Sequence, residues 1–265
     1  MQKDAIQRVE GGRRFRGDVR NKKPLISIIT VVFQDKGELE NILNNVFEFD
    51  TSEFELIVID GGSRDGTVEL LRQWDEKIDY WLSEQDAGIY DAMNKGISAA
   101  RGEYILHLNA GDRLIYLPVQ ELKSAFMEQI DVAAFRVSIH GEREFIPSSG
   151  RLLRFRNTLH HQGTFYRSGI SPQYDLRYKV LADFDLNQRL ALRGAKIKSF
   201  ANIVALHAAG GISGSRLAHS ENLRIASKNH GWAYWVGAWV LSKGSSCKIR
   251  LRRIAQARRH MFTGC

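Results

Sequence analysis

The 265-residue sequence has few cysteines and few prolines, and each shortage excludes a kind of structure. Its two cysteines, Cys247 and Cys265, lie near the C-terminus and form no C-x-x-C pair, so we expect free thiols in a reducing cytoplasm. Four prolines argue against long flexible linkers. With 43% hydrophobic residues, the chain can instead bury one large core or two small ones.

Long hydrophobic runs are also missing. Residues 1–23 have no apolar centre, so we expect no signal peptide. The most apolar late stretch, residues 231–241, is about half of the ~20 residues that a membrane-spanning helix needs. We therefore expect a cytoplasmic protein without a membrane-spanning helix.

The net charge of +8 is concentrated at the two ends of the chain. Residues 1–23 carry eight Lys or Arg against three acids, and residues 243–260 carry seven Lys or Arg and no acid. The middle is therefore net acidic, which argues against a nucleic-acid partner. We predict a flexible basic arm over 1–23, one domain over 24–230 and an amphipathic basic tail over 231–265.

The first half of this domain alternates strands with helices. Short apolar runs predict buried strands at Ile26–Phe33, Phe54–Ile59, Ile78–Leu82 and Glu103–Leu108. Helices are predicted at 35–48, from near Thr67 onwards and at 89–100. This alternation indicates right-handed βαβ units, hence an α/β fold with a mostly parallel sheet flanked by helices.

The alternation weakens after Leu117. A hairpin across Gly141 is predicted from Val132–Ile139 and Arg143–Ile146, a short strand from Gly163–Arg167, and a helix over 182–193. We expect residues 118–230 to form a mixed half that binds an acceptor, beside a half at 24–117 that binds a nucleotide.

Three acids lie at or just after predicted strand ends: Asp60, Asp86 and Asp112. Ligands of such sheets bind beyond the carboxyl ends of the strands, so we expect these acids to share one edge. For Asp60 a ligand contact is favoured, whereas Asp65 more simply caps the next helix. Asp86 lies in an acidic stretch that a solvated loop and helix start would also explain.

The segment Leu108–Asp112 has the chemistry of a cation site. A nucleoside diphosphate gathers negative charge as its sugar–phosphate bond breaks, and Mg²⁺ or Mn²⁺ bound through oxygen ligands neutralises that charge. Asp112 is the candidate ligand, and Asn109 can orient it or bind ribose. The spacing alone also describes an ordinary turn.

The segment Leu181–Leu186 opens the predicted helix at 182–193 with two acids. A transfer that inverts the anomeric centre needs one base to take the proton of the acceptor hydroxyl. Asp183 is the candidate base and Asp185 the alternative. Two acids that only stabilise a helix N-terminus remain an open explanation.

Taken in order, Ile26–Phe33, Val58–Thr67, Ser83–Gly96 and Leu108–Asp112 resemble family 2 inverting glycosyltransferases of the GT-A fold, in a branch of bacterial polysaccharide enzymes that includes colanic-acid transferases. The resemblance covers roughly residues 25–215. It implies a Rossmann-like GT-A sheet, a nucleotide-sugar donor, a bound Mn²⁺ or Mg²⁺, and a glycan or polyprenyl-diphosphate-linked acceptor. By resemblance Asp112 binds the metal and Asp183 is the base. The donor contacts implied are Thr30, Val32, Asp60, Asp86, Asn94, Lys95, Asn109, Ala110 and Gly111.

Two positions depart from that family pattern. Members often have Asp-x-Asp at the metal site, where this chain has Ala110 before Asp112, and Glu-Asp at the base, where it has Ala182 before Asp183. Both departures keep the second Asp. We expect weaker metal affinity or altered base tuning with the chemistry retained.

Further candidates lie on the acceptor side. His161 and Gln162 follow the branch resemblance, as do Gly211 and Ser213 in a glycine loop near the diphosphate, although a plain loop explains the latter equally well. His207 is an alternative late metal ligand. A His160–His161 pair could suggest zinc, but no third ligand has suitable spacing.

The tail combines aromatic residues with cations. Trp232, Trp235, Val236, Trp239 and Val240 recur at helical spacing before the basic run, as in a helix at the surface of an anionic membrane. A helix packed on the core is the alternative.

The sequence therefore predicts an inverting glycosyltransferase in bacterial surface-polysaccharide biosynthesis, peripheral on the inner face of the cytoplasmic membrane. Its donor base is expected to be UDP first and GDP second. One alternative is a sugar-nucleotide pyrophosphorylase, although residues 30–35 lack the arginine expected of a triphosphate loop. The other is an inactive GT-A-like protein that binds the membrane surface.

Overall fold

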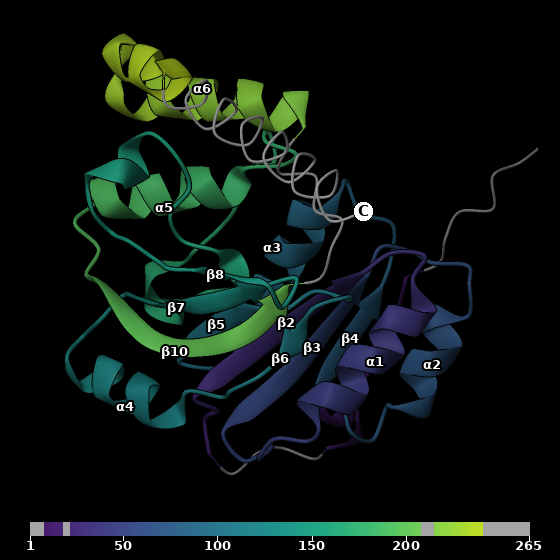
Figure 1. The fold of residues 1–265 in the computed structure, drawn as a ribbon. Coiled ribbons are helices and arrows are strands. Elements are labelled where there is room, and N and C mark those ends of the chain that lie inside the picture. The colour runs from purple at the N-terminus through teal and green to yellow at the C-terminus, as the bar shows by residue number, and fades with distance from the viewer. Residues whose placement is uncertain (1–7, 18–21, 208–214, 241–265) are drawn as a thin grey trace, which may run out of the picture.

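The computed structural model describes residues 8–17, 22–207 and 215–240. Within these residues ten strands form one sheet, in the order β1-β4-β3-β2-β5-β9-β7-β10-β6, and β8 pairs with β7 (Figure 1). The strands β4, β3, β2 and β5 run parallel to one another, and β7 runs parallel to β10. The remaining pairs are antiparallel, so the parallel half predicted at 24–117 adjoins a mixed half.

The first half consists of β2 (Ile26–Val32), α1 (Lys36–Val46), β3 (Phe54–Asp60), α2 (Thr67–Gln73), β4 (Tyr80–Ser83), α3 (Ile89–Ala99) and β5 (Tyr104–His107). Every predicted strand and helix of this half is confirmed, with shifts of a few residues at the ends. The strands β2 and β3 are buried on both faces, which explains why they read as continuous apolar runs. Asp65 accepts a hydrogen bond from the backbone N–H of Thr67, the first residue of α2. The N-cap residue is Gly66 rather than the predicted Asp65, so this contact lies one residue before the capping position.

The second half begins with β6 (Arg113–Leu114), α4 (Val119–Met127), β7 (Val132–Ile139) and β8 (Arg143–Phe145). The 3-10 helices η2 (Arg151–Arg154), η3 (His161–Gly163) and η4 (Ser168–Ile170) surround β9 (Thr164–Arg167). Then follow α5 (Ala182–Leu192), β10 (Ile197–His207) and α6 (Arg216–His230). The predicted hairpin, β9 and α5 are confirmed, whereas α4, β6, β10 and α6 were not predicted.

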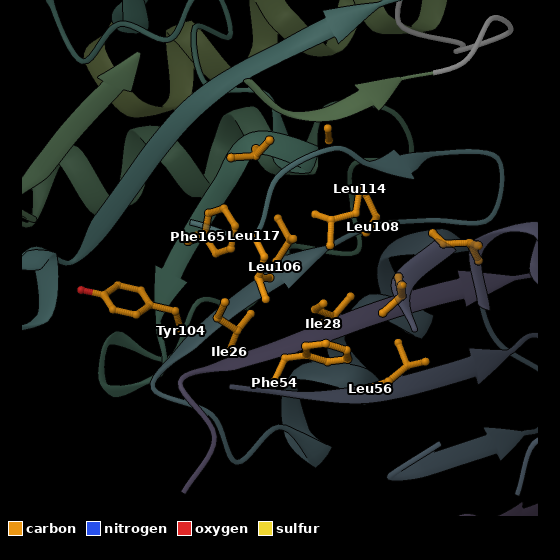
Figure 2. Close-up of a cluster of buried hydrophobic side chains, with 14 of the residues drawn as sticks. Ile26, Ile28, Phe54, Leu56, Tyr104, Leu106, Leu108, Leu114, Leu117 and Phe165 are labelled. Carbon is orange, nitrogen blue, oxygen red and sulfur yellow. The ribbon is translucent and has the colours of Figure 1, made fainter. Parts of the chain in front are cut away.

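Two clusters of buried side chains cover the faces of the sheet. One cluster packs α1, α2 and α4 against one face, and Figure 2 shows Ile28 of β2, Leu56 of β3 and Leu106 of β5 side by side on it. The other cluster packs α3 and α5 against the opposite face. The strand ends that carry the candidate site are thus held between two helical layers.

The N-terminal arm differs from its prediction over residues 8–17. Val9–Gly11 forms β1, which pairs antiparallel with β4, and Arg13–Arg16 forms the 3-10 helix η1. The guanidinium of Arg14 is nearly buried and donates to Glu55 at 2.7 Å. A guanidinium that is removed from water needs a carboxylate partner, and Glu55 supplies it. This ion pair, together with β1, fixes this part of the arm to the domain.

Candidate active site

Asp60, the last residue of β3, is fully buried and its carboxylate already has protein partners. It accepts hydrogen bonds from the backbone N–H and the hydroxyl of Ser63, and from the hydroxyl of Ser83 at 2.6 Å. These contacts fix the turn after β3 to the end of β4. The predicted direct contact between Asp60 and a nucleotide would require some of these hydrogen bonds to be exchanged.

Asp86 lies at the same edge and is half-buried. A methyl group on Gly61 would come within 2.7 Å of Asp86 Oδ2 and 3.1 Å of the Phe33 ring, so glycine leaves room for both side chains beside this position. Burial, assisted by the charges of Asp91 and Asp60, raises the pKa of Asp86. Sequence reasoning missed Phe33, which directly follows β2 and is 64% exposed. An exposed ring beside a carboxylate can stack on a nucleobase.

Two predicted donor contacts lie inside the sheet. Thr30 is buried, and its hydroxyl donates to the carbonyl oxygen of Leu108 at 2.8 Å. Val32 is also buried. In this arrangement both residues fix the position of the strand ends.

Two other predicted donor contacts hold loops. Asn94 donates to the carbonyl of Tyr174 at 2.9 Å and accepts from its N–H at 2.8 Å. The Lys95 ammonium lies 2.9 Å from Glu84 Oε1 and 3.4 Å from Asp91 Oδ2. Both side chains therefore order segments next to Asp86.

The loop after β5 presents Asp112. Gly111 has φ +90°, a conformation that favours glycine, and the N–H of Asn109 donates to Asp112 Oδ2 at 3.1 Å. Gln162 Nε2 lies 3.0 Å from Asp112 Oδ2, and His207 Nδ1 lies 2.8 Å from Oδ1. The N–H of Ala110 donates to the carbonyl of Val31, which ties the loop to β2.

Strand register brings these distant residues together. In the antiparallel pair of β6 and β10, Leu206 lies opposite Arg113, so the next residue, His207, reaches Asp112. In the pair of β5 and β9, Ile105 lies opposite Tyr166. Continuing that register places η3, with His161 and Gln162, beside the loop at 109–112.

The donor set around Asp112 fits a hard divalent cation. The side-chain oxygens of Asn109 and Gln162 are buried and have no hydrogen-bond partner in the described part of the chain. Carboxylate and amide oxygens are ligands that Mg²⁺ and Mn²⁺ accept. Within residues 8–17, 22–207 and 215–240, no group of three or more His, Cys, Asp or Glu is placed to hold a metal ion.

Asp183 lies in the first turn of α5 and is only 6% exposed. Its Oδ2 accepts a hydrogen bond from Asn157 Nδ2 at 2.7 Å, and its Oδ1 accepts from the N–H of Phe184 at 2.8 Å. These two donors fix the plane of the carboxylate. Sequence reasoning missed Asn157, because an asparagine in a loop carries no signal by itself.

His161 joins the two halves of the site. Its Nδ1 lies 3.7 Å from Asp183 Oδ2, and its Nε2 lies 3.4 Å from the Asn109 amide nitrogen. Asp112 is therefore linked to Asp183 through Asn109 and His161. At the neighbouring His160, burial and the charge of His161 lower the pKa to about 3, although the carboxylates of Asp183 and Asp112 act in the opposite direction.

Buried polar groups support Asp183 from behind. The hydroxyl of Tyr166 donates to Asn187 Oδ1 at 2.8 Å, and Asn187 Nδ2 donates to Asn157 Oδ1 at 3.2 Å. From α6, the buried carboxylate of Glu221 accepts hydrogen bonds from the backbone N–H groups of residues 179–181. Both arrangements hold the segment that leads into α5.

The alternative base, Asp185, is fully buried and paired with two cations. Its Oδ2 accepts from Arg189 at 2.6 Å and its Oδ1 from Lys228 at 3.1 Å. Both oxygens of this carboxylate are therefore already paired within the protein. The predicted contacts at Gly211 and Ser213 lie outside the described residues.

Solved structures of similar fold come from nucleotide-sugar enzymes. Residues 1–349 of S. aureus TarS, in complex with UDP-GlcNAc, match 76% of this chain with a TM-score of 0.61 and 15% identity. This chain spans 64% of that TarS fragment. The mannosyltransferase PcManGT from Pyrobaculum calidifontis, in complex with GDP-Man and Mn²⁺, matches with a TM-score of 0.53 and 14% identity, over 90% of this chain and 81% of that one. The fold is thus that of the GT-A glycosyltransferases.

Sequence comparison gives the family. The model of glycosyl transferase family 2 matches residues 27–170. A PGL/p-HBAD biosynthesis glycosyltransferase of Mycobacterium bovis BCG is 30% identical over 196 residues, which cover 68% of this chain and 75% of the relative. The chain belongs to glycosyltransferase family 2, and it is a transferase. This assignment removes the pyrophosphorylase alternative.

Proposed function

We propose that this chain is an inverting glycosyltransferase that moves a sugar from a nucleoside diphosphate to a hydroxyl of a glycan or lipid-linked acceptor in the synthesis of a bacterial surface polysaccharide. One observation carries the proposal: Asp112 and Asp183 are joined through Asn109 and His161. An in-line displacement needs a base on one side of the anomeric carbon and charge stabilisation on the other. This arrangement supplies both.

Asp183 is the base of the proposed reaction. As the acceptor oxygen attacks the anomeric carbon, its proton passes to the Asp183 carboxylate, and the nucleoside diphosphate leaves from the opposite face. The configuration at the anomeric carbon is therefore inverted. Asn157 and the N–H of Phe184 keep the carboxylate in one plane, so that little reorganisation is needed during the reaction.

Asp112 and His207, with the side-chain oxygen of Asn109, would hold Mn²⁺ or Mg²⁺. Gln162 presents its amide nitrogen to Asp112, so its oxygen is not placed as a ligand. When bound, such a cation neutralises charge on the departing diphosphate. The complex of PcManGT with GDP-Man and Mn²⁺ supports a divalent cation beside the donor.

The nucleobase of the donor is proposed to bind between Phe33 and Asp86. The exposed ring offers a stacking surface, and the carboxylate at this edge can accept a hydrogen bond from a base N–H. UDP is the first expectation, which the complex of TarS with UDP-GlcNAc supports, and GDP is the second.

The enzyme is proposed to work at the anionic inner surface of the cytoplasmic membrane. Trp232, Trp235, Val236, Trp239 and Val240 are exposed along one face of helix 232–240. The opposite face packs inward: Tyr234 stacks on Phe155, and Gly237 approaches the same ring closely. An aromatic face of this kind suits a membrane interface. No helix among the described residues has the length and hydrophobicity to span a bilayer.

Replacement of Asp183 tests the transfer reaction. We expect Asp183→Asn to lower the rate of sugar transfer by about 100-fold or more, because the acceptor proton loses its base. Donor affinity, measured by calorimetry with Mn²⁺, should stay near that of the wild type. The matched variant Asp185→Asn should retain transfer per folded molecule, with reduced thermal stability. Normal turnover by Asp183→Asn would overturn the assignment.

A further inference from the structure

The structure has a cavity that neither Asp112 nor Asp183 lines. This cavity, of about 370 Å³, is lined by three cations, two aromatic residues and a serine: Arg177, Tyr178, Arg224, Ser227, Lys228 and Trp235. It is formed where the segment before α5 meets α6 and helix 232–240. In Figure 1, α6 lies above α5, and helix 232–240 follows α6 at the yellow end of the colour scale.

The charges around this cavity are only partly balanced. Arg177 donates to Asp175 at 2.6 Å, and the Lys228 ammonium lies 3.3 Å from Asp175 and 3.1 Å from Asp185. Burial opposes the charged form of Lys228, but its hydrogen bond to Asp185 prevails and raises the pKa of this ammonium. Arg224 is exposed, and no carboxylate in the described part of the chain is paired with it. Three cations thus face two acids, and one guanidinium can still bind an anion.

The aromatic lining gives the cavity an amphipathic character. The ammonium of Lys228 lies over the ring of Tyr178, 5.3 Å from the ring centroid. Trp235 lines the cavity and also belongs to the exposed aromatic face of helix 232–240. A ligand here would meet both cations and aromatic rings. A phosphate group attached to an apolar chain has this combination.

We propose that this cavity binds the phosphate group of a membrane lipid, with Arg224 as its main ligand. The inference rests on the proposed contact of helix 232–240 with the membrane. Such a phosphate has two sources, a phospholipid headgroup and the diphosphate of a lipid-linked acceptor. Both present oxygen atoms that a guanidinium can bind through two hydrogen bonds.

The test compares Arg224→Ala with Arg216→Ala, which removes the same charge from an exposed position on α6 that does not line the cavity. One experiment measures binding to vesicles with and without phosphatidylglycerol. The other measures binding of farnesyl diphosphate in EDTA, which removes any cation from the donor site. Arg224→Lys should recover part of each lost affinity, since the charge returns without the bidentate geometry.

If the ligand is a phospholipid headgroup, Arg224→Ala should weaken binding to phosphatidylglycerol vesicles by about thirtyfold. Arg216→Ala should weaken it by about fivefold, because it removes only the long-range attraction of one charge to the membrane surface. If the ligand is instead the diphosphate of an acceptor, Arg224→Ala and Arg216→Ala should bind the vesicles with equal affinity. Only Arg224→Ala should then bind farnesyl diphosphate more weakly, by about tenfold or more. Equal behaviour of the variants in both experiments would overturn the proposal, as would a wild-type protein that binds neither probe.

These readouts are independent of sugar transfer. A protein that binds vesicles through Arg224 but never turns over a donor would contradict only the proposed reaction. A protein that turns over its donor but ignores both probes would contradict only the cavity and the membrane contact.

Discussion

At the scale of single residues, the site depends on side chains that position other side chains. Asn157 holds Asp183, and its own amide is oriented because Asn187 and the N–H of Leu159 donate to its oxygen. An oriented amide can only present its NH₂ group to the carboxylate. The geometry of the proposed base is therefore set by polar residues that carry no charge.

His107 provides a test of burial at this scale. It is fully buried in β5, neither ring nitrogen has a hydrogen-bond partner among the described residues, and burial lowers its pKa to about 3. In the unfolded chain the His107 imidazole therefore takes up a proton near pH 6.5, whereas in the folded chain it does so only near pH 3. Stability from the neutral ring is complete above pH 6.5 and is lost progressively as pH falls towards 3.

We predict that His107→Leu makes the free energy of unfolding less dependent on pH between 6 and 4, by up to about 1.4 kcal/mol per pH unit. At pH 7 this variant should be about as stable as the wild type, because the lost ring nitrogens have no partners to leave unpaired. Urea denaturation at several pH values measures both effects. His219→Leu, at an exposed position on α6, is the control, and an identical slope in His107→Leu and the wild type would contradict the prediction.

At the scale of elements, β10 and α6 complete the site from the end of the domain. The register of β10 against β6 delivers His207 to Asp112, and Glu221 on α6 holds the backbone just before Asp183. Neither element was predicted. The strand β10 is half-exposed without regular alternation, and α6 is mostly polar, so neither has a clear apolar pattern.

Helix 232–240 carries a prediction of its own. The double variant Trp232→Ala/Val236→Ser removes exposed apolar groups that neither line the cavity nor pack on Phe155. We expect it to weaken binding to phosphatidylglycerol vesicles by about tenfold or more, with little change in thermal stability. Flotation of vesicles measures the first and thermal unfolding the second. Leu217→Ala, an exposed apolar residue of α6, is the control. Unchanged flotation of the double variant would indicate a helix that faces only solvent or protein.

At the scale of the whole molecule, two halves of one sheet bring their ends to a common edge. The parallel half supplies Phe33, Asp86 and Asp112, and the mixed half supplies His161 and Asp183. A donor bound across this edge would contact both halves. Such a ligand binds the folded state alone and should stabilise it through mass action.

We predict that a UDP-sugar with Mn²⁺, at about 100 times its dissociation constant, raises the melting temperature by roughly 5 °C or more. GDP- and dTDP-sugars are the comparison ligands. EDTA, or the variant Asp112→Ala, should remove most of the shift caused by the best donor. A shift of equal size in EDTA would contradict a cation at Asp112, and a larger shift with a GDP-sugar would reassign the donor base.

The sequence by itself determined the first half of the fold and the identity of most candidate residues. Each strand and helix from β2 to β5 has a local signal, because apolar periodicity within about ten residues reflects burial on one or two faces. The order of these elements along the chain then assigns the acids at their strand ends to one edge of the sheet.

Only the tertiary structure decided what those residues contact. Asp60 is enclosed by Ser63 and Ser83, Asp185 is paired with Arg189 and Lys228, and His207 reaches Asp112 through the pairing of β6 with β10. Such contacts join segments far apart in the chain. They depend on strand register and helix packing, which local propensity does not encode.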